Sequence, residues 1–296
     1  MKGGSILCGA TAALLVAATL AFPQSDPAGR YRPEGGGAGA ARVIKKAQTP
    51  SLRQRTANLL RAAAANPASA EAHTDLCVSY FNAGRYADAA ESCRRAVGAR
   101  PGDAITHFNL GRVYDEAGRD YGAADVLKRA VSLAPGYANG HYALAGACAD
   151  LGLYQQAVAS LENAIRLEPG FAEAYSNLSA VLFRMEKYQE AVGPSERAAR
   201  LRPGVATMHS NLGTVYVAAR KYKAAVEAFK RSLRLEAGNP LVYHWLAQAY
   251  WGAGKNKEAA RALEYAVELK PDYAEARRDL GLTYLALSQR EAALEQ

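Results

Sequence analysis

Four histidines are spaced so regularly that they suggest a metal site. His73, His107 and His141 are 34 residues apart, and His209 follows at twice that interval. Imidazole binds zinc well, but zinc needs all of its ligands about 2 Å from the metal. If each histidine occupies the same place in its own packed helical unit, neighbouring histidines are about 10 Å apart. The spacing therefore predicts packing residues, with no bound metal and no other cofactor.

Common catalytic motifs are missing from the sequence. It contains no G-x-S-x-G nucleophile elbow, no phosphate-binding loop, no H-E-x-x-H zinc motif and no C-x-x-C redox pair. Carboxylates are scattered among Lys and Arg, as is usual on a solvated helix surface. These observations predict that the protein is not an enzyme.

Prolines and small residues share the interval of the histidines. The prolines of this series are Pro67, Pro101, Pro135, Pro169 and Pro203, followed by Ala237 and Pro271. A unit of 34 residues therefore starts at residues 70, 104, 138, 172, 206 and 240, and a partial one starts at 274. The eighth position of the unit is Cys77, Gly111, Ala145, Ser179, Gly213, Ala247 and Gly281.

Each unit has the pattern of two helices joined by a turn. Positions 4, 7, 8 and 11 form one stripe at helical spacing, and positions 20, 24 and 27 form a second. Glycine near position fifteen marks a turn between them. The proline ends the second helix, because it cannot donate a hydrogen bond and restricts the preceding residue. A single pair cannot bury both of its faces, so the pairs must stack.

This pattern resembles the tetratricopeptide repeat family, which has the same period and the same order of small and large residues. The resemblance covers residues 70–293 and implies an all-α fold. That fold is a right-handed superhelical solenoid of stacked antiparallel helix pairs. Residues 51–66 fit the second helix of an earlier unit, so we expect a lone capping helix there.

Two of the four cysteines face each other in such a hairpin. Cys77 at position 8 and Cys93 at position 24 are about equally far from the turn. In an exported protein they could form a disulfide. Both positions also suit small packing residues, so both interpretations stay open. Cys148 has no such partner and is expected to be a buried thiol.

The resemblance also implies a binding groove. In the family, positions 2, 5, 6, 9, 12 and 13 of the first helix line a concave surface that holds a protein or peptide partner. Position six carries Asn109, Asn177 and Asn211, whose amides can both donate to and accept from a peptide backbone. The aromatic anchors expected on the same surface are Phe108, Tyr142, Phe183, His244, Trp245 and Trp251.

The segment before the repeats has a different composition. Residues 1–21 combine one lysine, an uncharged apolar stretch and a small-residue cleavage site, as an export signal does. An uncleaved membrane anchor is the alternative, and no other membrane-integrated domain is expected. Residues 22–50 are rich in Pro, Gly and basic residues, which predicts a flexible linker. We therefore expect an exported protein, periplasmic or secreted.

Most of the net charge of +8 lies in this N-terminal part. Residues 1–65 carry nine Lys or Arg and two Asp or Glu, whereas the remaining chain carries 27 and 26. The balanced repeat region gives no reason to expect a nucleic-acid partner. Residues 30–61 could bind nucleic acid, but an export signal argues against that role.

These features together predict a protein–protein interaction scaffold. It would bind an extended or helical segment of a partner in the concave groove. Two alternatives remain open. The chain could be a substrate-recognition or accessory subunit of a cell-envelope enzyme such as a glycosyltransferase, or a part of an envelope assembly or secretion machine.

Overall fold

The structure, a computed structural model, describes residues 52–294, with side chains for residues 54–288. All regular elements in this range are helices, so the predicted all-α solenoid is confirmed. The export signal and the linker predicted for residues 1–50 lie outside the described range. In chain order the helices are α2 (Leu52–Ala65), α3 (Ala70–Asn82), α4 (Tyr86–Ala99), α5 (Ala104–Glu116), α6 (Asp120–Leu133), α7 (Ala138–Asp150), α8 (Tyr154–Leu167), α9 (Ala172–Arg184), α10 (Tyr188–Leu201), α11 (Ala206–Ala218), α12 (Tyr222–Leu235), α13 (Pro240–Gly252), α14 (Asn256–Leu269) and α15 (Ala274–Leu294).

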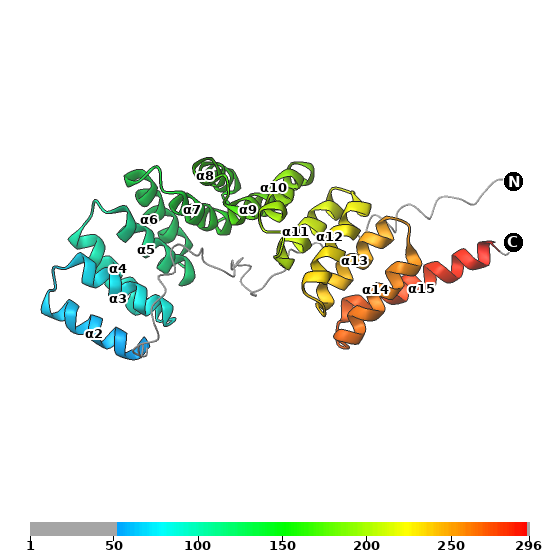
Figure 1. Cartoon of the computed structure of the whole chain (residues 1–296), viewed down its shortest axis with the longest axis horizontal. Coiled ribbons are helices and arrows are strands. Elements are labelled where there is room, and N and C mark those ends of the chain that lie inside the picture. The colour runs from blue at the N-terminus through cyan, green and yellow to red at the C-terminus, as the bar shows by residue number, and fades with distance from the viewer. Residues whose placement is uncertain (1–51, 295–296) are drawn as a thin grey trace. The chain divides into compact units, whose positions relative to one another are not determined.

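Within residues 52–167 and within residues 188–294, consecutive helices pack in pairs, and the pairs stack (Figure 1). The two helices of a pair contact each other, as α3 and α4 or α13 and α14 do, and the second helix also contacts the first helix of the next pair. First helices of neighbouring pairs touch as well, for example α5 and α7. A helical pair therefore buries its second face only through its neighbour, as the repeat pattern predicts.

The turn within each pair uses one residue in the left-handed conformation. Gly84, Gly118, Gly152 and Gly254 have φ between 69° and 74°. The same place in two other pairs holds Glu186 at φ 60° and Arg220 at φ 58°. The turn thus keeps one backbone shape even where the residue is not glycine, although glycine adopts that shape with least strain.

A small residue at position 8 lets the two helices of a pair approach closely. A Cβ atom added at Gly213 would lie 2.6 Å from the Phe229 ring. One added at Gly111 would lie 2.5 Å from the Leu127 side chain. In both pairs the large residue at position 24 fills the space that the glycine leaves, which is how interiors reach their packing density.

The described helices form two compact units. One lies within residues 30–177 and the other within residues 178–296, and their boundary falls within α9. The core of the first unit includes Leu76, Tyr80 and Leu110. The core of the second unit includes Phe229, Trp245 and Leu263. Each unit therefore has its own buried apolar cluster.

The last described element, which covers the partial repeat starting at residue 274, differs from the helix pairs before it. α15 runs as one helix of 21 residues through the place where the other pairs turn. That place holds Ser288, which lies within the helix instead of adopting the left-handed conformation. Among the described residues, the last pair is therefore followed by a single first helix.

Candidate protein-binding face

The four periodic histidines each bond the turn before their own helix. The Nε2 atoms of His73, His107, His141 and His209 lie 2.9–3.0 Å from a proline carbonyl oxygen six residues earlier. Within residues 54–288, no group of His, Cys, Asp or Glu side chains could hold a metal ion. The histidines fix the connection between one pair and the next.

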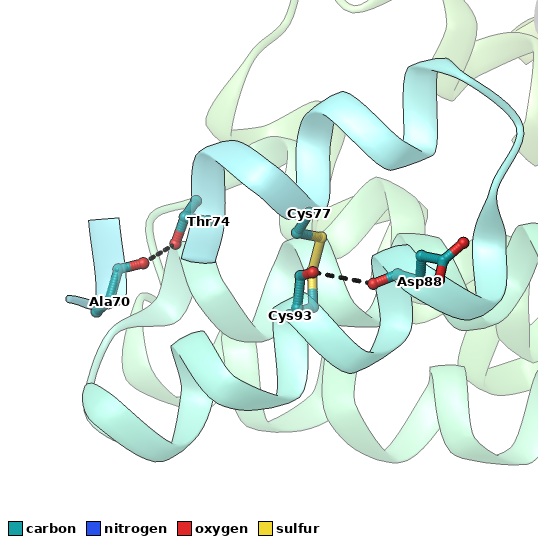
Figure 2. Close-up of a disulfide and its surroundings, with 6 residues drawn as sticks. Ala70, Thr74, Cys77, Asp88 and Cys93 are labelled. Carbon is teal, nitrogen blue, oxygen red and sulfur yellow. Dashed lines mark hydrogen bonds between the residues drawn. A yellow bond between two sulfur atoms is a disulfide. The ribbon is translucent and has the colours of Figure 1, made fainter. Parts of the chain in front are cut away.

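Cys77 on α3 and Cys93 on α4 are joined by a disulfide (Figure 2). Their Cα atoms are 5.2 Å apart, and both side chains are 1% exposed. The bond therefore links the two helices of the first full pair at the place where most other pairs combine a small residue with a large apolar one. Cys148 is a buried free thiol, and burial raises its pKa above the ordinary value.

On the first helices of the 30–177 unit, an arginine lies among aromatic rings. The Arg112 guanidinium is 4.8 Å from the Phe81 ring centre and 5.8 Å from that of Phe108. Such cation–π contacts restrain a long side chain. Arg112 is exposed, and the half-buried Asn109 makes no side-chain hydrogen bond to the described residues. A charged group and a free amide therefore lie together on α5.

The first helices α7 and α9 carry further residues of the predicted groove. Asn177 donates from Nδ2 to the Tyr142 hydroxyl at 3.1 Å, and its Oδ1 is buried. The Tyr142 ring is 4.9 Å from the Phe171 ring. Asn177 therefore orients Tyr142 and offers little of its own amide to a ligand.

The same aromatic contact recurs in other repeats, between position 5 and position 34, which is the last residue of the same repeat. Phe108 meets Tyr137 at 5.1 Å, and His244 meets Tyr273 at 5.2 Å. These edge-on contacts add to the packing between pairs. Aromatic side chains at position 5 thus stabilise the stack as well as lining the first-helix face.

Several residues predicted for the groove are buried in the 178–296 unit. Phe183 is 7% exposed and contacts Tyr188, and Asn211 is 8% exposed. Trp245 is 5% exposed because it packs against Phe229 in the core. These three side chains therefore expose little surface to a partner in this structure.

His244 is also buried, at 3% exposed, and belongs to a hydrogen-bonded group. Its Nδ1 is 2.8 Å from the Tyr273 hydroxyl and its Nε2 is 2.9 Å from an Asp279 oxygen. Burial alone would raise the pKa of Asp279, but the hydrogen bonds from His244 and Arg278 hold it below its ordinary value. The group joins α13 to α15 and leaves His244 no free nitrogen.

Trp251 is the one predicted aromatic of this unit that stays accessible. It lines a pocket of about 60 Å³ with Gln248, Leu282 and Thr283. Small-molecule sites usually measure roughly 300–1,000 Å³, so this pocket suits a single side chain. The residues that line it come from α11, α12, α13, α14 and α15.

Comparison with known families decides what this arrangement is. Four family models, each described as a tetratricopeptide repeat, together match residues 57–104 and 138–296. The chain is a tetratricopeptide repeat protein. The resemblance inferred from the repeat pattern is thereby confirmed for the repeats.

Solved structures of other tetratricopeptide repeat proteins share the fold. YrrB, described as having an unusual peptide-binding site, is 19% identical, with a TM-score of 0.58 over 64% of this chain and 98% of that one. PilF of Pseudomonas aeruginosa is 19% identical, with a TM-score of 0.61 over 72% of this chain and 96% of its own. MamA is 26% identical, with a TM-score of 0.53 over 58% of this chain and 94% of its own. The sequence has no significant match among curated proteins.

The fold of a tetratricopeptide repeat protein supports a role as a protein–protein interaction scaffold, and such repeats are generally not catalytic. Within the described residues, no helix is long and apolar enough to cross a membrane. Sequence reasoning missed Arg112, although its place one helical turn after Phe108 could have pointed to it.

Proposed function

We propose that this tetratricopeptide repeat protein binds an extended, acidic segment of a partner protein on the first helices of its 30–177 unit. The observation that carries this proposal is the position of Arg112 against the rings of Phe81 and Phe108. A guanidinium held in this way loses less side-chain entropy on binding than a free one. It can form two parallel hydrogen bonds with a carboxylate.

The neighbouring groups suit the rest of such a segment. The Asn109 amide can donate to one peptide group and accept from another. Phe108 and Tyr142 offer half-buried rings for apolar side chains. Salt bridges on this surface are worth little alone, so the affinity depends on combining the carboxylate contact with these rings.

Selection from a displayed library of random short peptides, with the purified protein as the target, tests this function. Peptides selected by the wild-type chain should be enriched in Asp and Glu, and Arg112→Glu should weaken their binding at least about tenfold, a loss of about 1.4 kcal/mol. Arg129→Glu on α6 is the matched control, because Arg129 is an exposed arginine on a second helix. Equal binding by both variants would remove Arg112 from the site.

We also infer that the protein acts outside the cytoplasm. The composition of residues 1–21 and the disulfide between Cys77 and Cys93 support this location, since disulfides persist in oxidising compartments. Residues 1–21 fused to a reporter that folds only after export should give an active reporter. A reporter that stays inactive, beside an active one carrying an established signal, would contradict export.

A further inference from the structure

The final helix exposes a face that every earlier repeat buries. Position 8 is buried in the six full repeats, yet Gly281 at position 8 of α15 is exposed. A Cβ atom added at Gly281 meets nothing within 4 Å, whereas the same addition at Gly213 meets Phe229. The space next to Gly281 is where a second helix would pack, and α15 has none because it continues straight.

Two further residues of α15 are also more exposed than their counterparts in earlier repeats. Tyr284 at position 11 is 47% exposed, whereas Tyr80 at the same position of the first repeat is 8% exposed. Arg277 at position 4 is exposed, although that place elsewhere holds a buried or half-buried His or Tyr. The open face of α15 is defined by Arg277, Gly281 and Tyr284.

Among residues 52–294, the first helix, α2, has no first helix of its own pair to pack against. Ala63 of α2 is 5% exposed against α3, and Thr56 Oγ1 is 2.8 Å from Ser79 Oγ, so one face of α2 packs as a second helix does. In the numbering of the repeat, Arg55 and Ala62 of this helix occupy positions 20 and 27, and both are exposed. In the six full repeats these positions are at most 3% exposed, because they face the first helix of the same pair.

We propose that α2 of a second copy packs on the open face of α15 and completes the seventh repeat. Leu59 of α2 occupies repeat position 24, and it would lie over Gly281 as Phe229 lies over Gly213. The small Ala62 would lie beside Arg277. Arg55 would reach Tyr284, in the kind of contact that Arg85 makes with Tyr80 at 4.5 Å.

This contact joins different surfaces of the two copies, so it is heterologous and leaves a free α2 and a free α15 at the ends of the assembly. Copies can therefore add in a row. The contact involves one helix from each chain, which is small for a stable interface, so association should depend strongly on concentration. It does not involve the first-helix face of the 30–177 unit, and therefore stands independently of the proposed function.

Sedimentation velocity of the purified full chain tests the proposal. Wild-type protein should form species larger than a dimer as the concentration rises into the high micromolar range. Gly281→Leu fills the open face and should keep the chain monomeric. Gly98→Leu is the matched control, because Gly98 also lies in a helix with no atom within 4 Å of an added Cβ, and it should associate like wild type.

A second variant separates this contact from pairing between two copies of α15. Ala62→Glu changes only the exposed face of α2, and glutamate is a good helix former. This variant alone should be monomeric. Mixed with Gly281→Leu it should give a 1:1 dimer and nothing larger, since one variant keeps its α15 face and the other keeps its α2 face.

Three results would overturn the proposal. They are wild-type protein that stays monomeric throughout, Ala62→Glu protein that associates like wild type, and a mixture that forms no dimer. Far-UV circular dichroism of every variant should match wild type. The urea midpoint should stay close to wild type for Ala62→Glu and should not fall for the two leucine variants, because leucine favours a helix more than glycine does. The changes would then act on association and not through loss of folding.

Discussion

The Nε2 atom of His141 lies 2.9 Å from the carbonyl oxygen of Pro135. The proline follows the second helix of one repeat, and the histidine lies on the first helix of the next. The same bond recurs at His73, His107 and His209. A regular row of histidines can therefore arise from a structural bond that repeats with the fold, and need not indicate metal.

Replacing His141 by alanine should destabilise the array. The change removes one hydrogen bond, which should cost about 1 kcal/mol. His141→Tyr is the control, because repeats four and six carry Tyr175 and Tyr243 at this position. Urea midpoints followed by circular dichroism should fall for the alanine variant and change less for tyrosine. A tyrosine variant as unstable as alanine would show that the aromatic ring cannot replace the histidine here.

Adding one methyl group at position 8 should have opposite effects in two repeats. At Gly213 the new Cβ would overlap the Phe229 ring, and overpacking of this kind should cost about 1–3 kcal/mol. At Gly281 there is no neighbour, so alanine should stabilise α15 by up to about 1 kcal/mol through its helix propensity. Urea unfolding of Gly213→Ala and Gly281→Ala measures both. Equal effects would contradict the close approach at Gly213.

Thiol titration should reveal one reactive cysteine per unfolded chain. In a Cys8→Ser variant without reductant, only Cys148 should react with a thiol reagent, and only slowly until urea is added, because it is buried and its pKa is raised. Reduction should expose three thiols and lower stability by about 3 kcal/mol, the value for a loop of this size. Three thiols in the unreduced, unfolded chain would mean that Cys77 and Cys93 are not bonded.

Stability should decrease in alkali between pH 10 and pH 12. Burial, together with a hydrogen bond to Glu196, raises the pKa of Tyr216 to about 12, and burial, together with nearby carboxylates, raises that of Tyr273 to about 12. The unfolded chain releases these protons near pH 10, whereas the folded chain keeps them, so the folded state is favoured below that range and loses stability as the pH rises through it.

Urea midpoints at pH 9 and pH 11.5 measure this loss. Tyr216→Phe and Tyr273→Phe should each reduce the difference between the two midpoints, because phenylalanine has no proton to release. Tyr121→Phe, at a side chain that is 79% exposed, is the control. The linkage would be wrong if the two buried-site variants kept the full wild-type difference.

The sequence by itself determined the repeat and its boundaries. Prolines and small residues at a fixed interval located the six full pairs, and Gly84, Gly118, Gly152 and Gly254 marked their turns. This succeeded because a helix pair is defined by residues close in the chain, and stacking imposes the same small and large residues on every copy. The turns at Glu186 and Arg220 were identifiable only through that register.

Tertiary structure decided which of the residues on the first helices remain accessible. Trp245 and Trp251 both belong to α13, yet one packs in the core and the other lines a pocket. Likewise, Asn211 is buried and Arg112 lies between two rings from different helices. The surroundings of these side chains depend on residues some 30 positions away, such as Phe81 for Arg112, and the repeat register leaves the identities of those residues open. Which face of a repeat can meet a partner is therefore set by how its neighbours fill the space between the helices.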